Sequence, residues 1–198
     1  DWSSDVCSSD LRLLKGWADA VWDMGRAFGT IGCRKGEWQV EITTYRSEIY
    51  DPDSRKPDVD FGDSLVGDLR RRDFTVNAMA VRLPDREIVD PFGGVVDLAH
   101  RVLRTPGTPE DSFSDDPLRM MRAARFAAQL GFDVDAAVVA AMTAMADRIE
   151  IVSAERVRDE LVKLVCAPLP RRGLGILVET GLAERGLPEL PRSEEHTS

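Results

Sequence analysis

The sequence lacks a long apolar run, a secretory leader and a disulfide pattern, and each absence excludes a class of protein. Charged residues interrupt every apolar stretch well before the ~18 residues that a membrane-spanning helix needs. No basic and then apolar leader opens the chain, so we expect no secretory signal. The three cysteines are odd in number and widely spaced, which argues against a disulfide scaffold and fits a reducing cytoplasm.

The charge balance is acidic. The 198 residues contain 26 Lys and Arg against 35 Asp and Glu, which gives a formal net charge of −9. Non-specific coating of nucleic acid draws on a broad cationic surface, so this balance excludes that class of protein. A local basic site stays compatible with it. The length suffices for one large domain or two small ones with a real core.

Both ends of the chain differ from the sequence between them. Residues 1–11 and 192–198 are rich in Ser, Asp and Glu and show no apolar periodicity. They are either disordered tails or translated sequencing adapter, because one DNA sequence that encodes 192–198 encodes 5–11 on its other strand. We favour the adapter. Since the two tails carry −3 and −1, the expected native segment, residues 12–191, has a net charge of −5 and too few Cys and His for a zinc site.

Residues 12–107 form a mixed α/β half, and residues 108–191, rich in Ala, Leu, Met and Arg, form an all-helical half. The expected elements are a helix over 16–26, strands over 28–31 and 38–44 joined by a hairpin at 34–36, an exposed loop over 45–60, a helix over 64–71, strands over 77–82 and 87–89, and helices over 115–130, 135–148, 154–166 and 172–180.

The densest motif spans residues 68–80, where three consecutive arginines precede Asp73, Thr75 and Asn77. Arginine is suited to bidentate recognition of phosphate, so Arg72 is a candidate phosphate ligand. The alternative, favoured on composition alone, is a solvated basic turn that Asp73 caps.

A second motif begins at Asp115-Asp116-Pro117 and continues with Arg119, Arg122 and Arg125, which recur at every third residue. Pro117 fits the first turn of a helix, and the carboxylates before it suit that helix's N-terminus. A carboxylate only accepts hydrogen bonds and a guanidinium only donates them. Asp116 with Arg119 can therefore accept cytosine and adenine, which place an amino donor beside a ring-nitrogen acceptor, and reject guanine and uracil. The alternative is an ion-paired surface face.

A third motif, Glu41-Ile42-Thr43-Thr44-Tyr45, places an acidic residue in the interior of an expected strand. Burial of a charge is costly, so Glu41 is either aimed at a metal ion or lies on an edge strand facing water.

In this order, the motifs resemble those of the class II tRNA nucleotidyltransferases, which are the CCA-adding enzymes, with the bacterial poly(A) polymerases as close relatives. The resemblance covers nearly all of residues 12–191. The segments that carry it are Gly29–Gly32, Glu41–Arg46, Ser54–Pro57, Arg71–Ala78, Asp90–Gly94 and Asp115–Phe126.

The resemblance implies an α+β chain, an N-terminally truncated nucleotidyltransferase palm with a mixed sheet followed by an all-helical neck. It implies that Arg72 contacts the phosphates or ribose of the nucleotide and that Asp73 and Asn77 shape the same pocket. The resemblance also implies that Asp116 and Arg119 read the base edge. It implies that Arg122 and Arg125 hold the base-reading helix and the triphosphate side. Glu41 would be the third carboxylate of the metal site.

The chain departs from the family at one point. The family's Gly-Gly…Arg-Asp element and its Asp-x-Asp pair, which binds two Mg²⁺ ions, are missing before Arg12. We therefore expect an inactive internal fragment of an enzyme that adds CMP and AMP from CTP and ATP to the tRNA 3′ end with Mg²⁺, in the cytoplasm and without a membrane. The alternatives are a fragment of a poly(A) polymerase and a non-catalytic nucleotide- or RNA-binding module.

Overall fold

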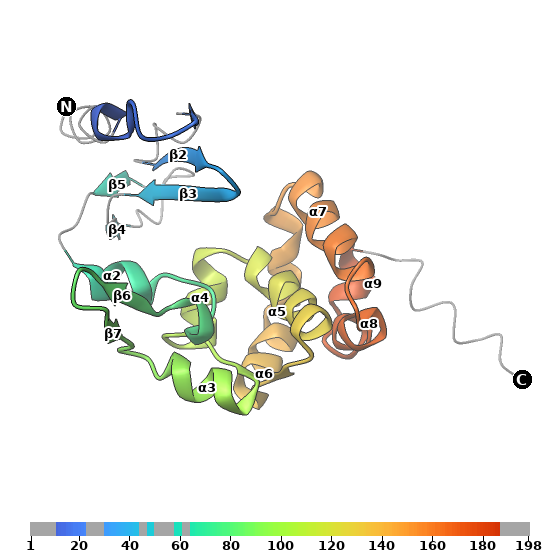
Figure 1. Cartoon of the computed structure of the whole chain (residues 1–198). Coiled ribbons are helices and arrows are strands. Elements are labelled where there is room, and N and C mark those ends of the chain that lie inside the picture. The colour runs from blue at the N-terminus through green and yellow to red at the C-terminus, as the bar shows by residue number, and fades with distance from the viewer. Residues whose placement is uncertain (1–10, 23–29, 44–46, 50–57, 61–63, 187–198) are drawn as a thin grey trace, which may run out of the picture. The chain divides into compact units, whose positions relative to one another are not determined.

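The computed structural model describes residues 11–22, 30–43, 47–49, 58–60 and 64–186 (Figure 1). The chain divides into two compact units, Asp1–Asp68 and Leu69–Ser198. The expected tails lie almost wholly outside the described residues, as do the motif residues at 29, 44–46 and 54–57.

The first unit holds a three-stranded antiparallel sheet in the order β1-β2-β3. The expected hairpin is confirmed, because Lys35 pairs with Trp38 across a turn at Gly36, whose φ of +57° suits glycine. Ile31 and Cys33 on β2 are buried beside Leu14. The strands of this unit are β1 (Ala20–Trp22), β2 (Thr30–Lys35), β3 (Trp38–Thr43), β4 (Ser47–Ile49) and β5 (Asp58–Asp60).

Two expectations for this unit are wrong. The segment expected as a helix over 16–26 contains strand β1, in which Trp22 pairs with Gly32 of β2. The Trp22 indole lies so close to Gly32 that any side chain at position 32 would collide with it. Pairing with a strand that carries a glycine therefore decides the conformation of residues 20–22, although the spacing of their apolar residues predicted a helix. The segment expected as a loop over 45–60 contains β4 and β5, which pair antiparallel.

The second unit is mainly helical (Figure 1), and helix α2 (Leu65–Arg70) crosses its boundary with the first. No helix among the described residues is long and apolar enough to cross a bilayer. The further elements are η2 (Thr75–Asn77), β6 (Ala80–Arg82), β7 (Glu87–Val89), α3 (Gly94–His100), β8 (Val102–Leu103), α4 (Pro109–Asp115), α5 (Leu118–Leu130), β9 (Asp133–Val134), α6 (Ala136–Ala144), η3 (Ala146–Ile151), α7 (Ala154–Val165), α8 (Pro170–Glu179) and α9 (Leu182–Gly186).

The expected helices form with shifted ends. The helix expected over 115–130 is interrupted at Asp116-Pro117, between α4 and α5, because proline lacks the N–H that would continue α4. Helix α8 begins at Pro170, two residues before the expected start at 172, because the missing N–H of proline has no intrahelical partner to lose at that position.

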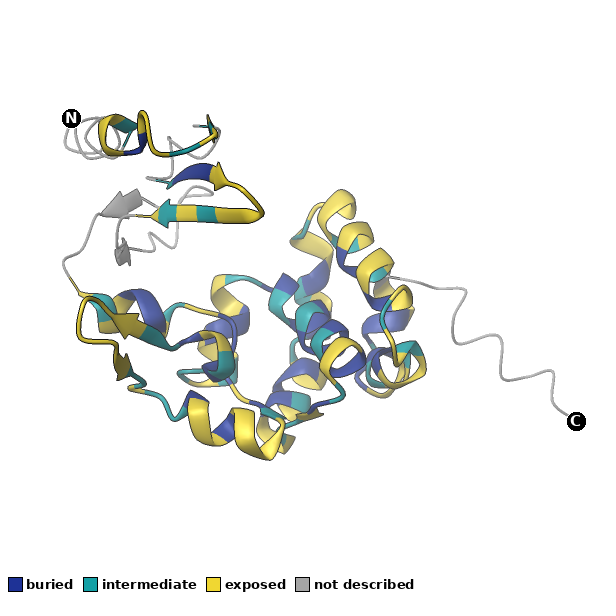
Figure 2. Cartoon of the chain, in the orientation of Figure 1, coloured by how far each residue is buried: buried dark blue, intermediate teal, exposed yellow. Residues whose placement is uncertain are grey.

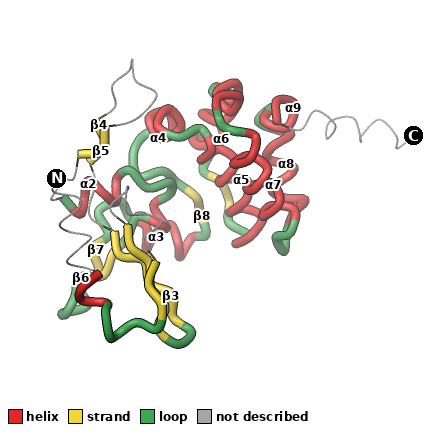
Figure 3. Tube along the Cα trace, turned by 90° about the horizontal axis from the view of Figure 1, so that it is seen from above, coloured by secondary structure: helices red, strands yellow, loops and turns green. Residues whose placement is uncertain are grey.

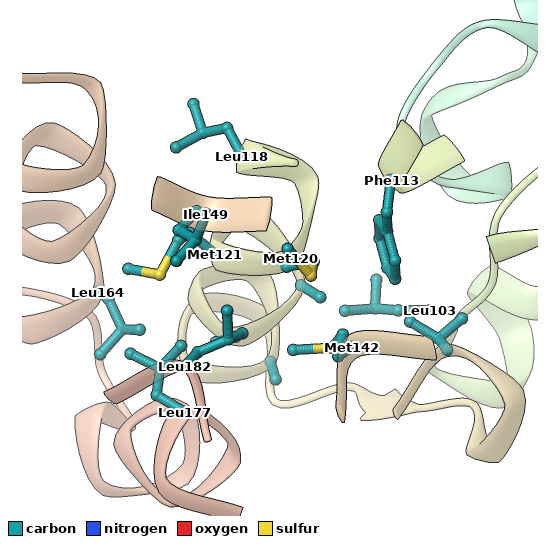
Figure 4. Packing of buried hydrophobic residues seen from close by; sticks show 14 of the residues in the cluster. Leu103, Phe113, Leu118, Met120, Met121, Met142, Ile149, Leu164, Leu177 and Leu182 are labelled. Atoms are coloured by element: carbon teal, nitrogen blue, oxygen red, sulfur yellow. The ribbon is translucent and has the colours of Figure 1, made fainter. Parts of the chain in front are cut away.

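Helix α5 is the centre of the second unit, and α7 and α8 lie beside it (Figures 1 and 3). Its buried face combines four alanines, at 123, 124, 127 and 128, with larger side chains such as Met120 and Met121 (Figure 2). A Cβ on Gly173 of α8 would lie 2.6 Å from the carbonyl oxygen of Ala124, so α8 approaches α5 at backbone distance. Figure 4 shows Leu164 and Leu177 on one side of this core and Phe113 on the other.

The compact units divide at residue 68, whereas the sequence predicted a domain boundary at residue 107. Phe74 and Leu103, which precede that predicted boundary, are fully buried in the same hydrophobic core as the helices that follow it. The segment from 69 to 107 therefore packs as part of the helical unit. The division of the sequence into 12–107 and 108–191 stays a prediction.

Candidate nucleotide-binding site

Six charged or amide side chains of the second unit line one hollow of about 380 Å³. This volume lies within the range of small-molecule sites, about 300–1,000 Å³. We call it the arginine hollow. It is lined by Arg72, Asp73, Asn77, Asp116, Arg119 and Arg122, which come from the two arginine-rich motifs of the sequence.

Asp73 joins the two motifs. Its Oδ1 accepts hydrogen bonds from the backbone N–H of Phe74 at 2.8 Å and from Nδ2 of Asn77 at 3.0 Å. Its Oδ2 accepts from Nε and Nη2 of Arg122 at 2.8 and 2.5 Å. The buried carboxylate thus fixes the position of Arg122 and Asn77 in the wall of the hollow.

A second buried carboxylate, Asp97 of α3, holds the turn that carries Asn77. It accepts a hydrogen bond from the hydroxyl of Thr75 at 2.7 Å and from Nη1 of Arg104 at 2.5 Å. The N–H of Thr75 donates in turn to the carbonyl of Arg104. A hydrogen bond to Asp135, together with the charge of Asp97, raises the pKa of the Arg104 guanidinium. The η2 turn is therefore anchored to α3 and to the strand that follows it.

Asp116 and Arg119 lie at the break between α4 and α5. Asp116 Oδ1 accepts from the N–H of Leu118 at 3.2 Å, as a carboxylate does at a helix N-terminus, and Oδ2 accepts from Nη2 of Arg156 at 2.9 Å. Arg119 donates to Ser112 and to the carbonyl of Arg71. Both side chains are therefore held in place at the edge of the hollow.

The three arginines of α5 point to three different partners. Positions three residues apart on a helix differ by roughly 60° around its axis, so Arg119 and Arg125 differ by roughly 120°. Arg122 contacts Asp73, but Arg125 is turned toward α7, where its Nε donates to Glu160 at 2.5 Å. Arg125 does not line the hollow, and the contact it makes fastens α5, the helix that carries Arg119 and Arg122, to α7.

Glu41 lies in the first unit, on β3 opposite Gly32, and is exposed. Among the residues that the structure describes, no three Asp, Glu, His or Cys side chains gather closely enough to hold a metal ion. The described residues thus do not assemble a metal site around Glu41.

The arginine hollow combines a positive charge with hydrogen-bond donors and acceptors. Three arginines and two aspartates leave it with one net positive charge, which suits a polyphosphate. Asp116 supplies hydrogen-bond acceptors and Arg119 supplies donors, side by side. This is the combination that an amino group next to a ring nitrogen requires.

Ser112, which contacts Arg119, and Arg156, which contacts Asp116, were not predicted from the sequence. Arg156 lies 40 residues after Asp116, and no spacing in the sequence links the two. Ser112 lies one helical turn before Asp116, so the helical period of α4 was the one signal that could have identified it.

Two family profiles match the chain. The one described as "Poly A polymerase head domain" matches residues 7–104, and the one described as "Probable RNA and SrmB- binding site of polymerase A" matches residues 131–193. The chain belongs to the family of class II CCA-adding enzymes and poly(A) polymerases. Nucleotidyltransferases of this family are enzymes and are generally metal-dependent.

Curated CCA-adding enzymes resemble the chain along most of its length. That of Levilactobacillus brevis is 44% identical over 161 residues, which are 81% of this chain and 40% of the relative. That of Streptococcus gordonii is 42% identical over 191 residues, 96% of this chain and 47% of the relative. The chain thus spans less than half the length of these relatives.

Solved structures of the family share the fold. The CCA-adding enzyme of Bacillus stearothermophilus in complex with CTP superposes with a TM-score of 0.73 at 38% identity, over 83% of this chain and 40% of that one. A tRNA nucleotidyltransferase complexed with a primer tRNA and an incoming ATP analogue gives 0.70 at 25% identity, over 93% and 52%. The α+β class expected from the sequence is confirmed.

Proposed function

We propose that this chain is the part of a CCA-adding enzyme that binds CTP and ATP and selects them by their base edge. The observation that supports this most is the position of Asp116 and Arg119 at one hollow with Arg72, Asp73 and Arg122. A donor–acceptor pair for the base and a cationic wall for the phosphates occur together, and neither alone would define a nucleotide. In the whole protein, the function is transfer of CMP and AMP to the tRNA 3′ end.

The relatives support the choice of substrate and partner. One solved structure contains CTP, and another contains a primer tRNA with an ATP analogue. We assign Arg72 to the phosphates or ribose of the nucleotide, Asp73 and Asn77 to the shape of the pocket, and Arg122 to the triphosphate side. With tRNA and nucleoside triphosphates as substrates, the activity belongs in the cytoplasm.

We propose Mg²⁺ as the metal of the whole enzyme, with Glu41 as one ligand. We propose that nucleotide selection in the arginine hollow rests on hydrogen bonds of Asp116 and Arg119, which need no metal ion. Among the described residues no three Asp, Glu, His or Cys side chains gather into a metal site, and we expect the 198-residue chain to bind nucleotide without transferring it. Incorporation of labelled CMP into tRNA by the purified chain would contradict this expectation.

Equilibrium binding of CTP, ATP, UTP and GTP to the purified chain tests the proposal. We expect CTP and ATP to bind more tightly than UTP and GTP, and Asp116→Ala to lower the CTP-to-UTP preference by about 10-fold, since a hydrogen bond to a charged group is lost. Asp115→Ala is the matched control, because Asp115 is exposed and does not line the hollow. Equal affinity for all four nucleotides would refute the proposed function.

A poly(A) polymerase is the second candidate, because the matching head-domain profile carries that description. The same titration separates the two candidates. An enzyme that adds only adenylate should bind ATP and discriminate against CTP, whereas the proposed CCA-adding function requires both to bind.

A further inference from the structure

Ser112 of α4 contacts both members of the base-reading pair. Its hydroxyl oxygen accepts a hydrogen bond from Nη1 of Arg119 at 2.9 Å, and its carbonyl oxygen accepts a second one from the same nitrogen at 3.3 Å. That carbonyl also accepts the backbone N–H of Asp116 at 3.2 Å. Ser112 itself is buried, with 6% of its surface exposed. One residue therefore connects the donor and the acceptor of the pair.

The contacts of Arg119 leave a defined set of donors for a ligand. A guanidinium carries five N–H donors in a fixed planar fork. Two of them point to Ser112 and a third, from Nη2, donates to the carbonyl of Arg71 at 2.5 Å. The two that remain are on Nε and Nη2. They lie in the plane that Ser112 and Arg71 set, so the direction in which they point depends on these anchors.

We propose that Ser112 is a positioning residue for base selection, which acts by fixing the plane of the Arg119 guanidinium beside Asp116. This inference rests on the proposed function and adds a residue to it. The ring-nitrogen and carbonyl acceptors of cytosine have to meet the remaining donors of Arg119 while its amino group meets Asp116. If the hydroxyl is removed, Nη1 keeps only the longer bond to the carbonyl, and the guanidinium can turn to accommodate other edges.

The test compares the CTP-to-UTP affinity ratio of the 198-residue chain with that of Ser112→Ala, in titrations with each nucleotide. We expect the ratio to fall by about 5- to 10-fold, from loss of a hydrogen bond to a charged group. A ratio reports positioning rather than stability. Partial unfolding weakens the apparent affinity for both nucleotides by the same factor and therefore cancels.

Two further variants sharpen the comparison. Ser114→Ala removes the same hydroxyl from an exposed position of the same helix and should leave the ratio unchanged. Ser112→Thr keeps a hydroxyl and should restore most of the preference that Ser112→Ala loses.

The outcomes separate this inference from the proposed function. If the unaltered chain shows no preference for CTP over UTP, the proposed function fails. If it shows the preference and Ser112→Ala retains the full ratio, or Ser114→Ala lowers it equally, the positioning role of Ser112 is refuted while the proposed function stands.

Discussion

Replacement of Glu160 by alanine probes the buried ion pair that fastens α5 to α7. The side chains of Arg125 and Glu160 are 9% and 5% exposed, and Nε lies 2.5 Å from Oε2. Glu160→Ala leaves the arginine charge in the protein interior without its counter-ion. Removal of one partner of such a pair destabilises a protein by about 3–5 kcal/mol.

The surroundings of Arg125 favour the lower end of that range. Its Nη1 still donates to Gln129 at 2.7 Å, and its guanidinium lies 3.9 Å from the centre of the Phe126 ring. We therefore expect a loss of about 3 kcal/mol, which for a chain of this size lowers the melting temperature by roughly 6–12 °C. Circular dichroism at 222 nm is the suitable assay, since it follows the helices of the second unit.

Two comparisons make the result decisive. Lys163→Ala removes an exposed partner of the same carboxylate, at 3.4 Å, and should change stability by less than about 1 kcal/mol. The double variant Arg125→Met/Glu160→Leu removes both charges and should be far more stable than Glu160→Ala. The reasoning is refuted if Glu160→Ala has the same melting temperature as Lys163→Ala. It is also refuted if the double variant is as unstable as Glu160→Ala.

Three other predictions concern single positions. Gly173→Ala should destabilise the second unit by about 1–3 kcal/mol in chemical unfolding, because its Cβ would meet the carbonyl of Ala124 at 2.6 Å. Arg101→Gly should stabilise it by about 1 kcal/mol in the same assay, because Arg101 ends α3 at a φ of +57°. The N–H of Gly36 lowers the pKa of Asp19 below its ordinary 3.8, so this carboxylate's stabilising effect is present above that value and is lost as the pH falls through its folded-state pKa. The Gly36 amide shift in NMR should titrate with a midpoint below 3.8, and a midpoint above it would contradict the contact.

The sequence predicted local order better than the contacts between motifs. The arginines of residues 119–125 and the helix that carries them follow from residue type and period. That Arg122 meets Asp73, 49 residues away, follows from no period, and the shared pocket came only from the family resemblance. The helical period implied a turn from Arg119 to Arg125, but which of them would face the hollow depends on how α5 packs, and Arg125 faces α7 instead.

Short strands were the least predictable elements. β1 contains three residues, and Trp17 and Val21 have the spacing of a helical face. Pairing with β2 decides its conformation, since Gly32 leaves room for the Trp22 indole. This pairing cannot be predicted from residues 20–22 alone. The pairing of β4 with β5, which have three residues each, was missed as well.

The short parallel pair β8–β9 closes the segment from which Asp116, Arg119 and Arg122 of the hollow come. The N–H groups of Asp133 and Asp135 donate to the carbonyls of Arg101 and Leu103, and these bonds bring together the two ends of the segment that contains α4 and α5. The segment, which contains Asp116 and Arg119, is thus a loop closed at its two ends. Hydrogen exchange at two amides, those of Asp133 and Asp135, therefore reports how often this closure opens.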